Sequence, residues 1–293
     1  MRIGDVVVRK SYNKDVTFKI VDIKEVDGKK VYILKGINIR IVADAKESDL
    51  ETVGDSFSGE KDKILNSRVN KALKNIMIYR DLKERKGDKS SSKAKKAPAP
   101  EKDELFFGRP GKILHIDGDS EYLDTCLKVY KQLSLEAVGE AVPESKQPER
   151  VVELVKKNNP DIVVLTGHDS VVRNTNDYLN LNNYRNTKYY IESVKALREY
   201  NNNYDELIIF AGACQSCYEC ILDAGANFAS SPSRVLIHCL DPVFVCEKIA
   251  YSNIDEVIPI KDIIENTITG SKGIGGLQTR GKYRKGYPKS PYL

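Results

Sequence analysis

A histidine and a cysteine each follow a short apolar run in this sequence. His168 comes directly after Ile-Val-Val-Leu-Thr-Gly, and Cys214 comes after Leu-Ile-Ile-Phe-Ala-Gly-Ala. A thiol beside an imidazole is the minimum requirement for a cysteine nucleophile, because the imidazole can take the thiol proton. The two residues therefore predict nucleophilic chemistry, provided that the fold brings them together.

The elements around the two residues predict such a meeting. Both runs are short, uniformly apolar and rich in β-branched residues, which is typical of strands buried on both faces of a parallel sheet. Between them, the apolar residues of segment 189–200 recur at helical spacing. A strand–helix–strand unit makes a right-handed crossover, which can place the two strands side by side. Their carboxyl ends then share the edge of the sheet where α/β proteins bind ligands.

At that edge Cys214 would end a strand and begin a helix, where backbone N–H groups lower a thiol pKa. His168 would act as general base and then protonate a leaving amine. The N–H groups of Asp169 and Cys214 would form an oxyanion hole. A histidine about 50 residues before an Ala-Cys is also the caspase spacing. Gly-Ala-Cys-Gln-Ser departs from the caspase signature, and glycine precedes this histidine instead of following it.

Three aspartates are candidates for a substrate-specificity pocket. Asp117 and Asp119 end the first expected strand of the α/β region, next to the His168 strand across the switch point of the sheet. Asp241 follows an expected strand over residues 235–240. A carboxylate at the bottom of the pocket would select Arg or Lys in the substrate, with bidentate pairing to Arg. Turn or helix-capping roles remain alternatives for these aspartates.

A rival interpretation comes from the spacing Cys214, Cys217 and Cys220. Cys-x2-Cys-x2-Cys occurs in iron–sulfur proteins, which would make this region a metal- or cluster-binding redox module. No Cys-Pro follows, however, and the triplet continues into a helical pattern. The peptidase interpretation assigns no metal and no cofactor. Six cysteines in 293 residues do not suggest a disulfide framework, so we expect a reducing compartment.

The chain divides into five parts. Residues 1–52 contain four short strand-like runs, over 5–9, 18–23, 30–34 and 37–43, with an Asp-Gly turn between the second and third, which predicts an SH3-like β-barrel module. Residues 53–86 are an amphipathic helical segment, and residues 87–103 lack large apolar side chains, as a flexible linker does. Residues 104–269 alternate strand and helix, which predicts a caspase-like, doubly wound, mostly parallel α/β sheet. Residues 270–293 form a basic tail that we expect to be extended.

Charge is distributed unevenly along the chain. Residues 1–103 and 270–293 are net positive, whereas residues 104–269 are net negative. The acidic middle is suited to basic ligands, although three separately solvated surfaces would give the same pattern. Packing explains the basic helical segment better than nucleic-acid binding does. No apolar stretch is long enough for a membrane span or a secretory signal, and the sequence does not fix an oligomeric state.

Several blocks together resemble the YabG family of sporulation-specific proteases from spore-forming Firmicutes. They are Met-Arg-Ile-Gly-Asp-Val-Val at the start, Leu-His-Ile-Asp-Gly-Asp from residue 114, Thr-Gly-His-Asp from 166, Ala-Gly-Ala-Cys-Gln-Ser from 211, and Gly-Ser-Lys-Gly-Ile-Gly-Gly from 270. The resemblance covers nearly the whole chain and places the family's catalytic residues at His168 and Cys214. It assigns no acid of the specificity pocket.

The resemblance implies a cysteine endopeptidase of the mother-cell cytoplasm and the spore coat. Its protein partners would be spore coat and cortex-associated substrates, cleaved after basic residues, chiefly Arg, and it would process itself. A different interpretation is a non-catalytic docking protein of the spore coat, suggested by the β module and the basic arms of the chain.

Overall fold

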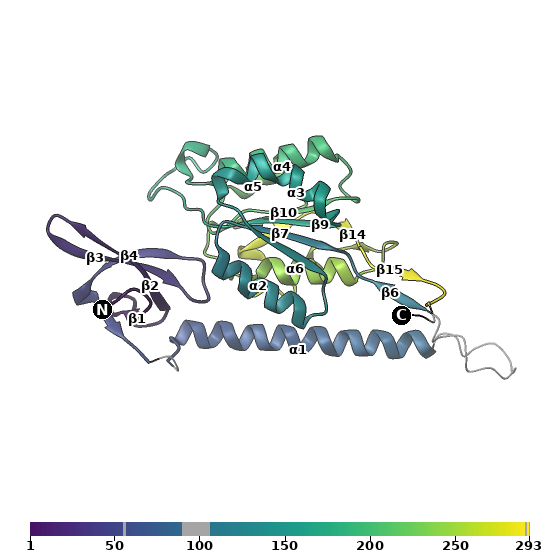
Figure 1. Cartoon of the computed structure of the whole chain (residues 1–293), viewed down its shortest axis with the longest axis horizontal. Helices are drawn as coiled ribbons and strands as arrows, with labels where there is room; N and C mark the ends of the chain where they lie inside the picture. Colours follow the sequence, from purple (N-terminus) through teal and green to yellow (C-terminus); the bar gives the residue numbers. More distant parts are fainter. Residues whose placement is uncertain (55–56, 90–105, 291, 293) are drawn as a thin grey trace, which may run out of the picture.

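The computed structural model describes residues 1–54, 57–89, 106–290 and 292. An N-terminal antiparallel sheet lies beside a larger α/β unit, and one long helix, α1 (Glu60–Lys89), runs beneath that unit (Figure 1). Residues 87–89 of the expected linker are the last residues of this helix, and residues 90–103 lie outside the described ranges. The expected helical segment 53–86 is therefore helical from Glu60 onward.

The N-terminal sheet has the strand order β4-β3-β2-β1-β5, and every neighbouring pair is antiparallel. Its strands are β1 (Val6–Arg9), β2 (Thr17–Val26), β3 (Lys29–Gly36), β4 (Val42–Lys46) and β5 (Leu50–Thr52). Asp27 and Gly28 both have positive φ, as a tight hairpin turn between β2 and β3 requires. Phe18, Ile20 and Leu34 are fully buried in the small core of this sheet.

The larger sheet has the order β13-β11-β10-β9-β7-β8. Its parallel strands are β7 (Ile113–Asp117), β8 (Ala137–Ala141), β9 (Ile162–Thr166), β10 (Ile208–Ala211) and β11 (Phe228–Ser230), and β13 (Ile274–Gly276) adds an antiparallel edge. The expected mixed α/β fold with a mostly parallel sheet is confirmed. The finer caspase-like and SH3-like descriptions remain predictions.

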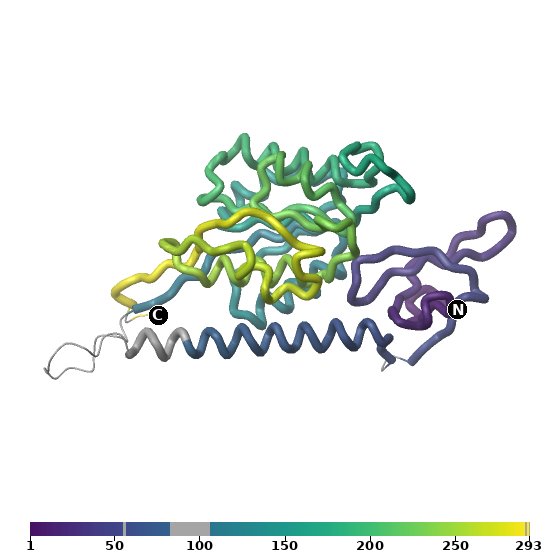
Figure 2. The backbone as a smooth tube through the Cα atoms, turned by 180° about the vertical axis from the view of Figure 1, so that it is seen from behind, coloured from purple at the N-terminus to yellow at the C-terminus, as the bar shows by residue number. Residues whose placement is uncertain are grey.

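Helices cover both faces of the larger sheet (Figures 1 and 2). One face carries α2 (Ser120–Gln132) and α6 (Asp241–Tyr251), with α1 packed beneath them, and the opposite face carries α3 (Gln147–Asn158), α4 (Thr187–Tyr200) and α5 (Tyr218–Asp223). Besides short 3-10 turns, the described chain also contains α7 (Ile260–Ile264) and two small antiparallel pairs, β12 (Val257–Ile258) with β14 (Thr279–Arg280) and β6 (Phe107–Arg109) with β15 (Arg284–Gly286).

Two expected strands are absent from their positions in the described chain. The apolar segment 235–240 is not a strand, and β11 occupies the place beside β10 instead. The backbone of this segment forms hydrogen bonds with the loop after β10 in place of a neighbouring strand. Gln215 N donates to Val235 O at 3.2 Å, and Ile237 N donates to Cys214 Sγ at 3.2 Å. Segment 37–43 is also not one strand, because residues 37–41 form a loop between β3 and β4.

The expected extended tail is partly built into the larger unit. Residues 274–276 pair with β11 as the edge strand β13, and the segments that follow form β14 and β15. The C-terminal segment therefore lies along the α/β unit and not apart from it (Figure 2).

Candidate active site

His168 and Cys214 follow adjacent parallel strands, as the sequence predicts. Leu165 of β9 is in register with Ala211 of β10, and Gly212 N donates to Leu165 O at 3.0 Å. Gly212 has a φ of +108°, a backbone conformation that glycine adopts without strain. The chain can therefore turn sharply after β10 and carry the cysteine to the edge of the sheet that β9 also reaches.

Cys214 is buried, and its sulfur has two close backbone partners. Sγ donates to Arg40 O at 3.1 Å and accepts from Ile237 N at 3.2 Å. Burial raises the pKa of the Cys214 thiol to about 11, although the Ile237 N–H favours the thiolate. The sequence-based expectation of a lowered pKa is wrong for this state of the site. Helix α5 begins only at Tyr218, so its N-terminus does not lie at the sulfur.

His168 follows β9, whose end lies beside the end of β7, and its side chain is largely buried. Its backbone N–H donates to Glu144 Oε1 at 2.6 Å, and its ring centroid is 5.9 Å from that of Tyr122. Nε2 is 3.6 Å from Asp119 Oδ2 and makes no hydrogen bond within the described residues. Burial, aided by the charge of Arg40, lowers the pKa of His168. The imidazole is therefore neutral near pH 7 and can accept a proton.

Asp117 is the last residue of β7 and forms a buried ion pair. Its carboxylate accepts hydrogen bonds from Arg40 Nη1 at 3.0 Å and from Arg40 Nη2 at 2.5 Å. It also accepts a hydrogen bond from Thr166 Oγ1 at 2.7 Å. Both side chains of the pair are 0% exposed. Burial alone would raise the pKa of Asp117, but the charge of Arg40 and hydrogen bonds from His115 and Arg40 hold it well below its usual range.

Arg40 is the residue of this site that the sequence does not reveal. It belongs to the loop of residues 37–41, whose polar and apolar residues alternate in a way that predicts a solvent-facing arginine. In the structure its guanidinium also donates to Gly167 O at 3.3 Å and lies 4.8 Å from the centre of the Tyr122 ring. Its side chain reaches Asp117, and its carbonyl oxygen reaches Cys214.

The other two candidate acids have different partners. Asp119 caps α2 by accepting from the N–H groups of residues 121 and 122, and it pairs with Lys35 at 2.6 Å. Asp241 is buried, and it accepts hydrogen bonds from His238 N and from both the N–H and the hydroxyl of Thr269. Asp119 therefore adjoins the histidine, whereas Asp241 anchors the start of α6.

Asp169 connects the loops around the site through its side chain. Its carboxylate accepts from Asn186 N at 2.8 Å, from the Thr187 hydroxyl and from Ser216 Oγ at 2.8 Å. Neither the Asp169 N–H nor the Cys214 N–H bonds the carbonyl oxygen of residue 40 within the described residues. The oxyanion hole therefore remains a prediction.

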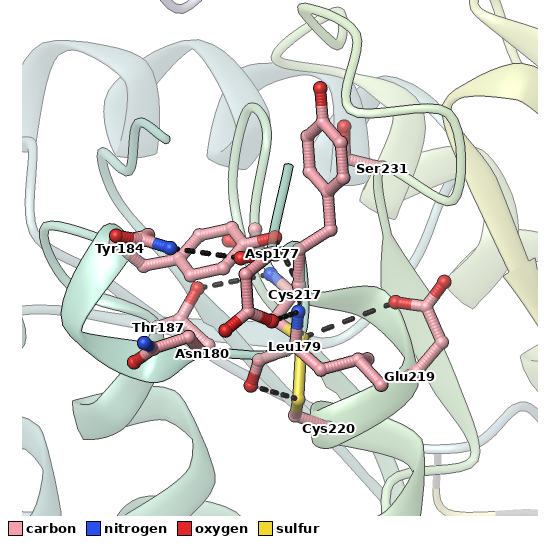
Figure 3. Close-up of a disulfide and its surroundings, with 12 residues drawn as sticks. Asp177, Leu179, Asn180, Tyr184, Thr187, Cys217, Glu219, Cys220 and Ser231 are labelled. Atoms are coloured by element: carbon pink, nitrogen blue, oxygen red, sulfur yellow. Dashed lines mark hydrogen bonds between the residues drawn. A yellow bond between two sulfur atoms is a disulfide. The ribbon is translucent and has the colours of Figure 1, made fainter. Parts of the chain in front are cut away.

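Cys217 and Cys220 are joined by a disulfide next to the site (Figure 3). Cys217 N donates to Thr187 Oγ1 at 3.0 Å, which ties this segment to the start of α4. The described part of the chain holds no group of three or more His, Cys, Asp or Glu side chains placed to bind a metal ion. The rival redox module therefore lacks a ligand set there. The sequence does not suggest a disulfide framework, and within the described residues this pair, three positions apart, is the disulfide that the structure holds.

Comparison with known proteins places the chain in a family. Residues 2–288 match the family described as YabG peptidase U57. The chain belongs to this family. It is 40% identical over 289 residues to the sporulation-specific protease YabG of Bacillus subtilis (strain 168), and the match covers 98% of each chain. No solved structure matches. YabG membership supports a protease role in sporulation. Within the described ranges, none of the helices is long and apolar enough to cross a membrane.

Proposed function

We propose that this protease is a cysteine endopeptidase that cleaves proteins after arginine, with Cys214 as nucleophile and His168 as general base. One observation carries the proposal. A single arginine places its guanidinium on Asp117 and its carbonyl oxygen 3.1 Å from the Cys214 sulfur. An arginine of a protein substrate in the same position would present its peptide bond to the nucleophile.

Asp117 is the acid of the specificity pocket in this proposal. A carboxylate that takes two parallel N–H bonds from a guanidinium favours Arg over the point charge of Lys. The Tyr122 ring adds a cation–π contact on the side of the pocket. A substrate with a neutral side chain would leave the buried carboxylate without its counter-charge, which is costly.

The reaction would run through a covalent thioester. His168 takes the proton of Cys214, the sulfur attacks the carbonyl carbon, and the imidazolium protonates the leaving amine. Asp119 would hold the imidazole in place, since its Oδ2 is 3.6 Å from Nε2. The Asp169 and Cys214 N–H groups would bind the oxyanion once the carbonyl oxygen gains charge. Water then hydrolyses the thioester and restores the thiol.

The biological substrates would be spore coat and cortex-associated proteins, processed in the mother cell and at the spore coat. The family supports a sporulation protease, and the acidic α/β region is suited to basic segments of such proteins. In a non-catalytic docking protein, the Cys214 thiol would take part in no reaction. The Cys214→Ala variant therefore separates the two functions.

The test uses purified chain and peptides that differ only in having Arg, Lys or Gln before the cleaved bond. We expect wild type to cleave the Arg peptide fastest and Cys214→Ala to cleave none. Cys246→Ala is the matched control, because Cys246 is also a buried free cysteine but lies in α6. Equal cleavage by wild type and Cys214→Ala would rule out the proposed nucleophile.

A further inference from the structure

We infer that the Arg40–Ile41 peptide bond of the intact chain is itself a substrate of this site and is cleaved intramolecularly. The inference rests on the proposed function, because it needs Cys214 as nucleophile and Asp117 as the specificity acid. It adds which bond of the chain is cut and which segment occupies the site before the cut.

The side chain of Arg40 is bound as the arginine of a substrate would be. Its guanidinium pairs with both oxygens of Asp117, is closed in by Tyr122 and donates to Gly167 O. The pair joins a loop of the N-terminal sheet to the end of β7. The Arg40 side chain is fully buried, so the protein's own chain fills the pocket.

The backbone on either side of Arg40 is also held as a peptide substrate. Ile39 forms an isolated antiparallel bridge with His238, in the segment that passes over the nucleophile. Addition of an extended segment to an exposed backbone edge is a recurring way to bind peptides. This bridge and the Asp117 pair leave the carbonyl oxygen of Arg40 at the Cys214 sulfur.

The loop is delivered to the site by a hairpin. Lys35 of β3 is paired with Val42 of β4, and Gly36 N donates to Ile41 O at 2.9 Å. The Tyr122 hydroxyl lies 2.5 Å from Gly36 O and 2.9 Å from Ile39 O and can donate its one proton to either, which anchors the loop to α2. Such fixed placement gives a peptide bond a high effective concentration at the nucleophile. Cleavage should therefore follow first-order kinetics.

The reaction consumes one water and leaves two chain ends. The Cys214 thiolate forms a bond to the Arg40 carbonyl carbon, the bond from that carbon to the Ile41 nitrogen breaks, and His168 transfers the thiol proton to that nitrogen. Water then attacks the thioester, which releases a carboxylate on Arg40 and restores the thiol. Opening of the loop lets Arg40 leave the pocket, so that another arginine can enter.

The primary experiment is intact-mass spectrometry of freshly purified wild type, Cys214→Ala and Cys246→Ala over time. We expect wild type and Cys246→Ala to yield residues 1–40 and 41–293 with a rate constant that is unchanged over a tenfold range of protein concentration. Cys214→Ala should stay intact, also when wild type is added, because its loop occupies its own site. Cleavage of Cys214→Ala at this bond by added wild type would overturn the intramolecular route.

A peptide assay on the same samples separates this inference from the proposed function. Wild type that cleaves Arg peptides while its Arg40–Ile41 bond stays intact refutes the inference alone. Wild type that cleaves neither refutes the proposed function as well. Arg40→Gln should keep the 40–41 bond intact, and a cut at this bond in Arg40→Gln would contradict the inference. If Arg40→Gln does not fold, Arg40→Lys keeps a cation beside Asp117 and should slow self-cleavage about tenfold or more; an unchanged rate contradicts the inference.

Discussion

The buried pair between Arg40 and Asp117 should hold the N-terminal hairpin against the α/β unit. A double-mutant cycle measures this directly, with Arg40→Gln, Asp117→Asn and the double variant, all made in the Cys214→Ala background so that no bond is cleaved. Gln and Asn keep hydrogen-bonding groups of similar size at both positions. The cycle therefore reports mainly on the paired charges.

The magnitude follows from the burial and the geometry of the pair. Both side chains are inaccessible, and two N–H bonds of 3.0 and 2.5 Å join them. Removal of one partner leaves the other charge buried and alone, which typically costs about 3–5 kcal/mol. The double variant should be less destabilised than the sum of the single variants. We expect a coupling energy of at least about 1.5 kcal/mol, as measured for close charge pairs elsewhere.

Urea denaturation is the assay, followed by far-ultraviolet circular dichroism and by tyrosine fluorescence, since the chain has 16 Tyr and no Trp. The pKa of Asp117 is lowered in the folded state, so its contribution is present above the unfolded pKa, about 4, and is lost as pH falls below it. The stability difference between the background and Asp117→Asn should shrink accordingly. A coupling energy below about 0.5 kcal/mol at pH 7 would refute the reasoning.

Three further predictions concern the site. Alkylation of Cys214 by iodoacetamide in the intact chain should be slow at pH 7 and rise about tenfold per pH unit toward pH 10, because burial raises its pKa to about 11; a plateau below pH 8 would contradict this. Asp119→Asn keeps a helix cap but removes a charge that raises the pKa of His168, so the acidic limb of the kcat/KM profile should move to lower pH; an identical profile argues against a positioning role. Gly212→Ala should lower the free energy of unfolding in urea by about 1–3 kcal/mol, because residue 212 has a positive φ. Gly54→Ala should change it by less than about 0.5 kcal/mol, because a Cβ there would meet no other atom. Equal effects of the two substitutions would exclude backbone strain at residue 212.

The sequence predicts the α/β unit well because its signals are local. The runs before His168 and Cys214 are uniformly apolar, and the structure pairs them as the neighbouring parallel strands β9 and β10, as expected. The same pattern fails at residues 235–240, which are as apolar as a strand. There the backbone bonds the cysteine loop, and the shorter segment of β11 pairs with β10.

The site is predicted only in part, because one of its members comes from outside the α/β unit. Asp117, His168 and Cys214 follow strands that the sequence reveals. Arg40 lies 77 residues before Asp117, in a loop between two strands of another sheet, so no local period links them. An alternating run of isoleucines with polar residues predicts a strand with its arginine in water, and only tertiary packing turns that run into a buried loop.

The burial of Arg40 helps to explain the arrangement of the site. A buried ion pair is weak grounds for stability, since apolar residues of similar volume often stabilise a core as well or better. Stability alone therefore gives no reason to place a charged pair at the contact between the hairpin and β7. In the proposed function, substrate recognition does give one, because a buried carboxylate that takes two parallel N–H bonds from a guanidinium selects arginine. Asp117 also accepts a hydrogen bond from Thr166, but its counter-charge comes from an arginine, and the hairpin supplies that arginine as Arg40. In the proposed function, the same contact that docks the N-terminal sheet would also keep the specificity acid paired until another arginine replaces it.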